Sequence, residues 1–282
     1  MRPILRNLLE QLKSNQLHYD YKRIKTAYFF AKRLHKGQVR QTGEPLIKHP
    51  LSVAITLADW GLDQQTIEAT LLHEVPESLP KDYVTVLEKK FGKDVLQLVE
   101  GVNRVGKIKL RSSQDVNFLE NIRKMFVAMA QDIRVVLIRL ADRLHNVKTL
   151  EAVPLSKQKR IAIETLQIYA PLAERLGMGQ LKGELEDLVF PFIYPEEYQW
   201  VMDIAKPHFK FSAENIKSSI TKIRQLLAKN NIKAQTDGRP KRKYSLYKKL
   251  LRPEINRDIT QIHDLMALRI ITEDVNSCYT VL

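Results

Sequence analysis

A short helical stretch near residue 70 ends in side chains that suit a divalent metal ion. An apolar run that closes with Leu71-Leu72 leads into His73-Glu74, and a second carboxylate follows at Glu77. Adjacent helical positions point about 100° apart, yet both side chains can lean toward one ion where a helix ends. An imidazole with carboxylates suits Mn²⁺ or Zn²⁺. The alternative is a helix C-terminus that carries a solvated His–Glu pair.

A carboxylate in a second helix needs a partner. The segment 133–150 has strong helical periodicity, and its apolar face, which begins at Ile133, is expected to be buried. Asp142 falls near the middle of this helix, where an unpaired buried charge would be costly. It could pair with Arg139 or Arg143, or it could serve as a metal ligand.

Four positions can then be combined into one site, because the glycine- and proline-rich loop 35–50 adds an imidazole. A cation held by this mixed N/O set would have room for water, a nucleophile suited to attack on phosphorus. Glu77 could orient that water or take its proton, and Arg40 in the same loop could grip a phosphate. The candidate ligands are His49, His73, Glu74 and Asp142. The other histidines are expected on the surface or in packing: His18, His35, His145, His208 and His263.

Composition restricts the protein class. The 282 residues are 44% hydrophobic and 28% charged, which is typical of a globular protein. No apolar run is long enough to cross a bilayer and no secretory signal is visible, so no membrane partner is expected. One cysteine, Cys278, excludes an internal disulfide framework and indicates a cytoplasmic location. The net charge of +14 favours polyanionic partners, although dispersed lysines are more often a solvated surface.

The pattern along the chain predicts a mainly helical protein with two domains, residues 1–195 and 196–282. Pro191 and Pro195 are expected to end the first, all-helical domain. Within it, a loop is predicted over 106–116 and a helix over 118–132. The second domain is predicted to begin with a helix from Ser212, as its N-cap, to Asn230, followed by a strand over 232–236. A loop is then predicted from Asp237-Gly238 through the basic run 239–243. A helix from about Tyr244 and a strand over 266–271 complete the pattern.

This strand, glycine loop, basic run and helix entry could hold a polyphosphate, because backbone amides and cations would point at it. An ordinary basic connector is the competing interpretation.

Several long motifs in one order give the chain a family resemblance. They are RQTGEPLIKHP, LLHEVPES, FGKDVLQLVEGV, IRVVLIRLADRLHN, ETLQIYAPLAERLGM, ELEDLVF, DGRPKRKYSLYKKL and DLMALRII. The chain resembles the N-terminal part of the RelA/SpoT homologues, which make and degrade guanosine tetra- and pentaphosphate. The resemblance implies an HD-type helical hydrolase domain that removes the 3′-pyrophosphate with Mn²⁺. It implies His49, His73, Glu74 and Asp142 as metal ligands, Glu77 at the catalytic water, and Arg40, Asn146 and Thr149 at the nucleotide.

Two residues depart from the family pattern in this domain. The family's His-Asp pair is His73-Glu74 here, which is longer by one methylene at a ligand, and Ser78 replaces the second acidic residue beside Glu77. Pro76 also removes a backbone donor. We therefore expect metal binding to persist and hydrolysis to be impaired.

The C-terminal part resembles the start of an α/β, nucleotidyltransferase-like synthetase domain. Residues Arg239, Lys241, Ser245 and Lys249 match contacts to the ATP donor, and Asp264 matches a carboxylate that holds Mg²⁺. The acceptor would be GDP or GTP, and Arg242 stands where a histidine is common. Because the sequence stops at Leu282, before the rest of such a sheet, GTP diphosphokinase activity is not expected of this chain alone. A fragment of a longer protein is then expected, and a ribosome partner only for that longer parent.

Two other functions remain open. One is a non-catalytic alarmone-binding or regulatory module, which Glu74 and Ser78 would suit. The other is a basic RNA-associated helical protein, which the charge alone supports.

Overall fold

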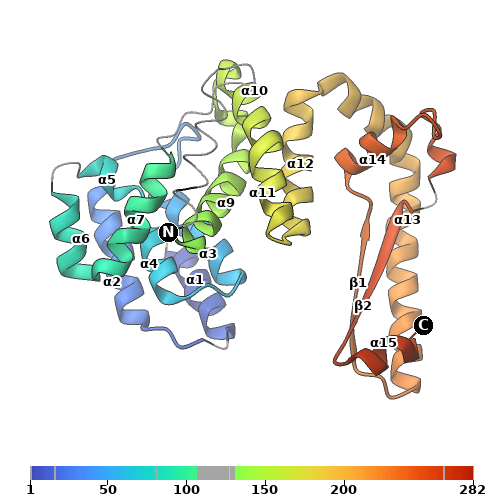
Figure 1. Cartoon of the computed structure of the whole chain (residues 1–282), viewed down its shortest axis with the longest axis horizontal. Helices are drawn as coiled ribbons and strands as arrows, with labels where there is room; N and C mark the ends of the chain where they lie inside the picture. The colour runs from blue at the N-terminus through green and yellow to red at the C-terminus, as the bar shows by residue number, and fades with distance from the viewer. Residues whose placement is uncertain are drawn as a thin grey trace. The chain divides into compact units, whose positions relative to one another are not determined.

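The computed structural model describes residues 2–15, 17–79, 82–106, 127, 131–262 and 264–281. In these residues the protein is mainly helical and has one small antiparallel sheet near its C-terminus, which confirms the predicted fold class (Figure 1). Contacts divide the chain into two compact units, Met1–Leu176 and Gly177–Leu282. The domain boundary expected at residue 195 stays a prediction. Within the described residues, no helix combines the length and the apolar character needed to cross a membrane.

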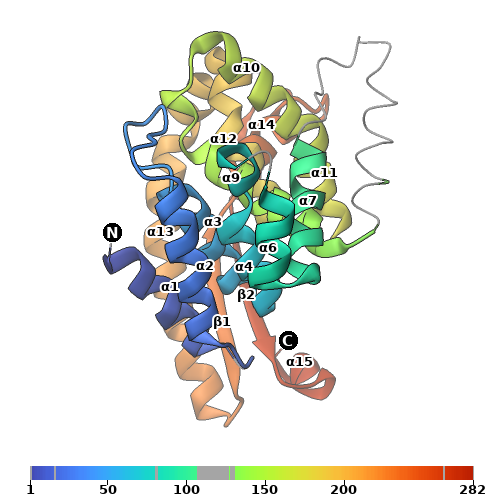
Figure 2. The ribbon, with the colours of Figure 1, turned by 90° about the vertical axis from the view of Figure 1, so that its left-hand side faces the viewer.

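The first unit is a group of helices (Figure 2). Its elements are α1 (Arg2–Ser14), α2 (Tyr21–Leu34), α3 (Lys48–Asp59), α4 (Gln64–Leu72), α5 (Val75–Ser78), α6 (Tyr83–Phe91), α7 (Lys93–Gly106), α9 (Ile133–Lys148), the 3₁₀ turn η1 (Leu150–Ala152), α10 (Leu155–Glu164), the π-helical turn η2 (Thr165–Tyr169) and α11 (Ala170–Arg175). The predicted loop over 106–116 and helix over 118–132 lie largely outside the described residues.

Helix α4 forms the centre of this unit, because it packs against α2, α3, α7 and α9. Every residue from 66 to 72 is buried, although the run includes polar side chains. Their polar atoms are satisfied locally: Thr70 Oγ1 donates to the Thr66 carbonyl at 2.7 Å. The Glu68 carboxylate accepts from Arg23 Nε at 3.1 Å and Nη2 at 3.0 Å. A helix buried on all sides has a fixed position, and so does the residue that follows it.

Two expectations about the first unit are wrong. His49 was expected in a loop, but α3 begins at Lys48, so His49 lies in its first turn. Pro50 occupies the third position of the helix, where the missing N–H would have no intrahelical acceptor. Ile133 was expected to be buried, but it is 52% exposed, and α9 buries the face that carries Val135 and Ile138.

The second unit combines helices with two strands. Its elements are α12 (Gly179–Ile193), α13 (Pro195–Lys229), β1 (Ala234–Pro240), α14 (Lys243–Leu250), the 3₁₀ turn η3 (Ile259–Gln261), β2 (Met266–Thr272) and α15 (Val275–Val281). Strands β1 and β2 pair antiparallel, with Asp237 opposite Arg269. A core around Phe190 joins α12, α13 and α14; its buried members are Phe190, Val201, Ala205, Leu246, Leu250 and Ile262.

Prolines and a glycine behave differently here from the sequence-based expectation. Pro191 lies inside α12, and α13 continues through Pro207 and Ser212, so Ser212 is not an N-cap. Strand β1 also includes Asp237-Gly238, which was expected to open a loop. A Cβ at Gly238 would lie 2.7 Å from Ile216 Cγ2 and 2.8 Å from Leu268 Cδ2. The glycine therefore permits close packing against α13 and is not needed for a turn.

Candidate functional site

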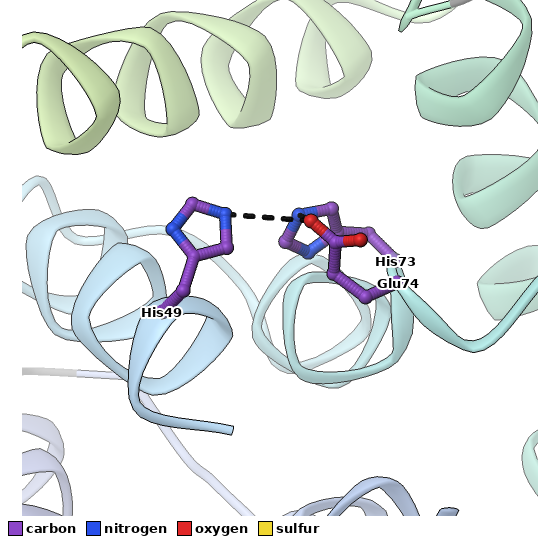
Figure 3. Close-up of side chains that lie close together, drawn as sticks. All are labelled: His49, His73 and Glu74. Atoms are coloured by element: carbon purple, nitrogen blue, oxygen red, sulfur yellow. Dashed lines mark ion pairs between the residues drawn. The ribbon is translucent and has the colours of Figure 1, made fainter. Parts of the chain in front are cut away.

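Three predicted metal ligands meet in the first unit (Figure 3). One ligand atom each from His49, His73 and Glu74 lies within 4.8 Å of the others. His49 comes from the first turn of α3, His73 caps the C-terminus of α4, and Glu74 precedes α5. Glu74 Oε1 lies 3.6 Å from His49 Nε2 and 3.4 Å from His73 Nε2. The rigid end of α4 thus brings two ligands to a third from another helix.

Asp142 joins this group from α9. Its Oδ1 lies 3.1 Å from His49 Nε2, and its Oδ2 accepts a hydrogen bond from Arg139 Nη1 at 2.7 Å. The two alternatives for Asp142, a site carboxylate and an ion pair with Arg139, therefore occur together on its two oxygens. Burial alone would raise the pKa of Asp142, but the charge of Arg139 outweighs it and holds that pKa well below its usual range. Asp142 is therefore ionised at neutral pH.

The hydrogen bonds of His73 test whether a cation fits. His73 Nδ1 lies 2.7 Å from the Thr70 carbonyl, which can only accept, so Nδ1 carries the hydrogen. Nε2 then presents a lone pair, and it is buried without a hydrogen bond. Native proteins bury few polar atoms without a hydrogen-bond partner, and a carbonyl on the other nitrogen is usual for metal-bound histidine. The residues fit a divalent cation, although the N/O set alone does not select one metal.

The same carboxylates affect the protonation of the imidazoles. Burial lowers the pKa of His73, but Glu74, whose Oε1 lies 3.4 Å from Nε2, and the charge of Asp142 outweigh it and raise that pKa. For Glu74, burial raises the pKa, and His73 with His49 lowers it below its usual value. A proton therefore competes with a cation for this group.

Arg40 reaches the group from the loop before α3. Its Nη2 donates to Asn146 Oδ1 at 2.7 Å, and its Nη1 lies 3.1 Å from His145 Nδ1. Asn146 Nδ2 in turn donates to Asp142 Oδ1 at 2.8 Å. Two of the predicted nucleotide-binding residues, Arg40 and Asn146, thus lie directly beside the predicted ligands.

His145 was expected on the surface or in packing, and this expectation missed its position in the site. Its Nδ1 lies 3.0 Å from His49 Nδ1, with the two rings 4.8 Å apart between centroids. Burial, His49 and Arg40 lower the pKa of His145 to about 4. In the sequence it reads as a basic residue in the last turn of α9, and its partner is 96 positions away. Only its place between Asp142 and Asn146 could have suggested a role.

The other predicted residues of the hydrolase site are less closely tied to the group. Thr149 caps the C-terminus of α9, with Oγ1 3.3 Å from the His145 and Asn146 carbonyls. Glu77 is exposed in α5. Ser78 Oγ lies 3.0 Å from Nδ1 of His35, which is buried. The predicted roles of Thr149 and Glu77 stay predictions.

A second set of contacts holds Asp142 from behind. Tyr169, which ends the π-helical turn η2, is buried close to Arg139 and Arg143. The guanidinium of Arg143 also lies over the Tyr169 ring, 4.1 Å from its centroid. Burial would raise the pKa of Tyr169, but the two arginines lower it. Arg139 therefore has the Asp142 carboxylate as its hydrogen-bond acceptor and Tyr169 nearby.

Three of the residues matched to a synthetase site meet in the second unit. Asp264 accepts hydrogen bonds from Lys241 Nζ at 2.5 Å and Lys249 Nζ at 2.7 Å. These two hydrogen bonds, Lys241 first, lower the pKa of Asp264 to about 2. Ser245 lies on α14, one turn before Lys249. The side chain of Arg239 is not described, and its backbone belongs to β1.

The start of α14 is held by α12. Asp187 Oδ1 accepts from the Tyr244 backbone N–H at 2.9 Å, and its Oδ2 lies 3.6 Å from Arg242 Nη1. The Arg242 side chain packs on Gly183, where a Cβ would lie 3.2 Å from Arg242 Cγ. The expected polyphosphate loop is therefore shorter than predicted, because β1 extends to Pro240 and α14 begins at Lys243.

Comparison with known proteins matches both halves of the chain. An HD domain model matches residues 27–179, and a model described as a region found in RelA / SpoT proteins matches residues 238–282. The guanosine-3′,5′-bis(diphosphate) 3′-pyrophosphohydrolase of Aquifex aeolicus is 45% identical over 279 residues, which are 98% of this chain and 39% of that protein. The bifunctional (p)ppGpp synthase/hydrolase SpoT of Escherichia coli K12 is 43% identical over 275 residues, 97% of this chain and 39% of that protein.

A GTP pyrophosphokinase of Myxococcus xanthus is 43% identical over 262 residues, 92% of this chain and 34% of that protein. A solved structure, described as a metazoan orthologue of SpoT that hydrolyses ppGpp, covers 62% of this chain and 97% of its own, with 23% identity and a TM-score of 0.46. The chain thus spans about two-fifths of the length of the first two relatives, at 39% of each.

Proposed function

Because this chain belongs to the HD-domain family, in its RelA/SpoT branch, we propose that its first unit removes the 3′-pyrophosphate of guanosine tetra- and pentaphosphate. The products are GDP or GTP and pyrophosphate. The observation that carries the proposal is the grouping of ligand atoms from His49 on α3 and from His73 and Glu74 at the α4–α5 turn, with Asp142 of α9 lying 3.1 Å from His49 Nε2. Relatives named for this hydrolysis align with nearly the whole chain.

His49, His73, Glu74 and Asp142 would hold a divalent cation, and we propose Mn²⁺. When bound, the cation supplies charge stabilisation at the phosphate and a water of lowered pKa. Three of these ligands are nearly or fully buried, so competing water is limited. Arg139 keeps the Asp142 carboxylate oriented through its 2.7 Å hydrogen bond. Glu77, exposed just after the group, would receive the proton of the attacking water.

Arg40 would bind the pyrophosphate that leaves. A guanidinium offers two parallel donors that match a phosphate, and Arg40 is the cation that reaches the group from the loop before α3. Its present partners, Asn146 Oδ1 and His145 Nδ1, are neutral, so a phosphate with its negative charge is the stronger acceptor. Exchange of partners at Arg40 would therefore accompany binding, with Asn146 and Thr149 at the nucleotide.

Glu74 and Ser78 would adjust the rate. The longer Glu74 side chain can still approach both imidazoles because Glu74 lies outside α4, in the αR turn before α5. Ser78 Oγ, held by His35, provides no negative charge beside Glu77. We therefore propose that metal binding is retained and that hydrolysis is slower than with a carboxylate at position 78.

For the second unit we propose only the binding of a nucleoside triphosphate. Lys241, Lys249 and Ser245, with Arg239, would contact ATP, and Asp264 would hold Mg²⁺ once a triphosphate has drawn the two lysines away. GDP or GTP would be the acceptor, and a ribosome partner is proposed only for a longer parent protein.

The test is incubation of the purified chain with guanosine tetraphosphate labelled in its 3′-pyrophosphate, with and without Mn²⁺. We expect Mn²⁺-dependent release of labelled pyrophosphate that EDTA abolishes and that His73→Ala lacks. Asp203→Asn, an exposed carboxylate on α13, is the matched control and should behave as wild type. Tight Mn²⁺ binding by wild type with the alarmone left intact would contradict hydrolysis and favour the binding module.

A further inference from the structure

His145 lies between the two functional parts of the first unit. On one side its Nδ1 is 3.1 Å from Nη1 of Arg40, the proposed phosphate-binding group. On the other side the same Nδ1 is 3.0 Å from Nδ1 of His49, a proposed metal ligand. One ring nitrogen therefore contacts both groups.

The hydrogen positions in this chain of contacts follow from Arg40. A guanidinium only donates, so Nδ1 of His145 must accept and its hydrogen must lie on Nε2. Nδ1 of His49 faces that same lone pair, so it must donate. His49 then carries its hydrogen on Nδ1 and presents the lone pair of Nε2. That Nε2 is the atom 3.1 Å from Asp142 and 3.6 Å from Glu74.

We propose that His145 is a positioning residue: its Nδ1 holds His49 in the tautomer that ligates a cation through Nε2, and it holds Arg40 ready for a phosphate. The inference rests on the metal centre of the proposed function. Outer partners of this kind orient ligating histidines, and their loss typically weakens metal binding about 10–100-fold. His73 has such a partner in the Thr70 carbonyl, and His145 fills the same place for His49.

The arrangement also links the two functions. Arg40 and His49 both donate to one lone pair, so they compete for it. When Arg40 leaves His145 to bind a phosphate, Nδ1 of His145 accepts a hydrogen bond from His49 alone, and that hydrogen bond becomes stronger. Phosphate binding therefore strengthens the hold on a metal ligand without moving α3 or α9.

The test compares three variants of the full chain by calorimetric titration of Mn²⁺ and by alarmone hydrolysis. His145→Leu removes the acceptor, and we expect Mn²⁺ affinity to fall about 10–100-fold and KM for the alarmone to rise. His145→Asn keeps an acceptor oxygen near the Nδ1 position, so it should recover most of the affinity. His18→Leu changes an exposed histidine in the same unit and should match wild type.

A readout of the tautomer separates positioning from loss of structure. Long-range ¹H–¹⁵N spectra of histidine-labelled, Zn²⁺-loaded protein should show His49 with its proton on Nδ1 and His145 with its proton on Nε2. In His145→Leu the Nδ1 proton of His49 should lose its hydrogen-bonded shift while thermal unfolding stays near wild type.

The outcomes are distinguishable. Wild-type Mn²⁺ affinity in His145→Leu, or a proton on Nδ1 of His145, would overturn the inference and leave the proposed hydrolysis standing. Weaker Mn²⁺ binding in His145→Leu, rescued by His145→Asn, supports the inference even if the alarmone is not cleaved. Absence of Mn²⁺ binding by wild type would overturn the metal centre and this inference together.

Discussion

Both units bring charged residues together, but hydrogen-bond acceptors predominate in the first unit and cationic side chains in the second. In the first, His49, His73 and Glu74 bring three ligand atoms together in a helical core, and Asp142 lies beside His49. In the second, two lysines already neutralise Asp264, whose side chain is 56% exposed. An excess of buried acceptors requires a cation, whereas an open set of cations requires an anion. This difference supports the proposal of a cation site in the first unit and an anion site in the second.

The comparison depends on each unit keeping its own core. Phe190 is fully buried at the centre of the second core, so Phe190→Ala should destabilise that unit by about 3–5 kcal/mol. Hydrogen exchange should show the loss in α12–α14 and little change in α4 and α9. Leu155→Ala, at an 82% exposed side chain, is the matched control. Equal loss of protection in both units would show that they unfold as one.

Removal of a ligand tests the excess of acceptors directly. His73→Ala should weaken Mn²⁺ binding by at least about 100-fold, more than the loss of an outer partner, because it deletes a donor atom. Calorimetric titration measures the change, with Asp203→Asn as control. Nucleotide triphosphate binding by the second unit should not change. Unaltered Mn²⁺ affinity would mean that the cation does not bind at this group.

A carboxylate at position 78 should increase the rate of hydrolysis by the first unit. Ser78→Asp places a negative charge beside Glu77 and keeps an acceptor for His35, so turnover should rise at least about tenfold. The effect should appear in kcat, with Mn²⁺ affinity nearly constant. Ser78→Asn, similar in size and neutral, is the control. A gain of the same size in both variants would rule out the charge as its cause.

Lowering the pH should change the stability of the two units in opposite directions, through one aspartate at the start of a helix in each unit. Arg134 lowers the pKa of Asp132, the N-cap of α9, so its stabilisation is present above the usual pKa of 3.8 and is lost as pH falls below it. Burial raises the pKa of Asp187, which holds the start of α14, so its ionised form is costly and acidification relieves that cost.

Thermal unfolding of Asp132→Ala and Asp187→Asn from pH 3 to 7 measures both effects. Asp132→Ala should cost about 1 kcal/mol at pH 7 and less at pH 3. Asp187→Asn keeps the acceptor and should flatten the pH dependence of the second unit. The same pH trend for both variants would contradict the assigned signs.

The sequence predicted the helices of the first unit well because periodicity is local. It also predicted His49, His73, Glu74 and Asp142 as one ligand group; the structure places the first three together and Asp142 beside His49, and their role as metal ligands stays a prediction. His145 was not predicted, since its role depends on contacts with residues 96 and 105 positions away.

Other errors arose from prolines and a glycine, because these residues can end an element or be accommodated within it. Pro50 and Pro191 suggested breaks, but one lies in the first turn of α3 and the other within α12. Gly238 suggested a turn, but its role is close packing against Ile216, which a pattern of single residues does not reveal.

The π-helical turn η2 has a consequence for how this sequence can vary. Five residues, Thr165–Tyr169, occupy a turn that is wider than an α-helical one, so the segment contains one residue more than a regular helix would. A one-residue deletion there would straighten the helix and rotate Tyr169 by about 100°. Arg143 would then lose its contact with the Tyr169 ring, and Arg139, which donates to Asp142, would lose its neighbour Tyr169. Among homologues, a one-residue alignment gap at this turn should therefore accompany loss of the carboxylate at position 142.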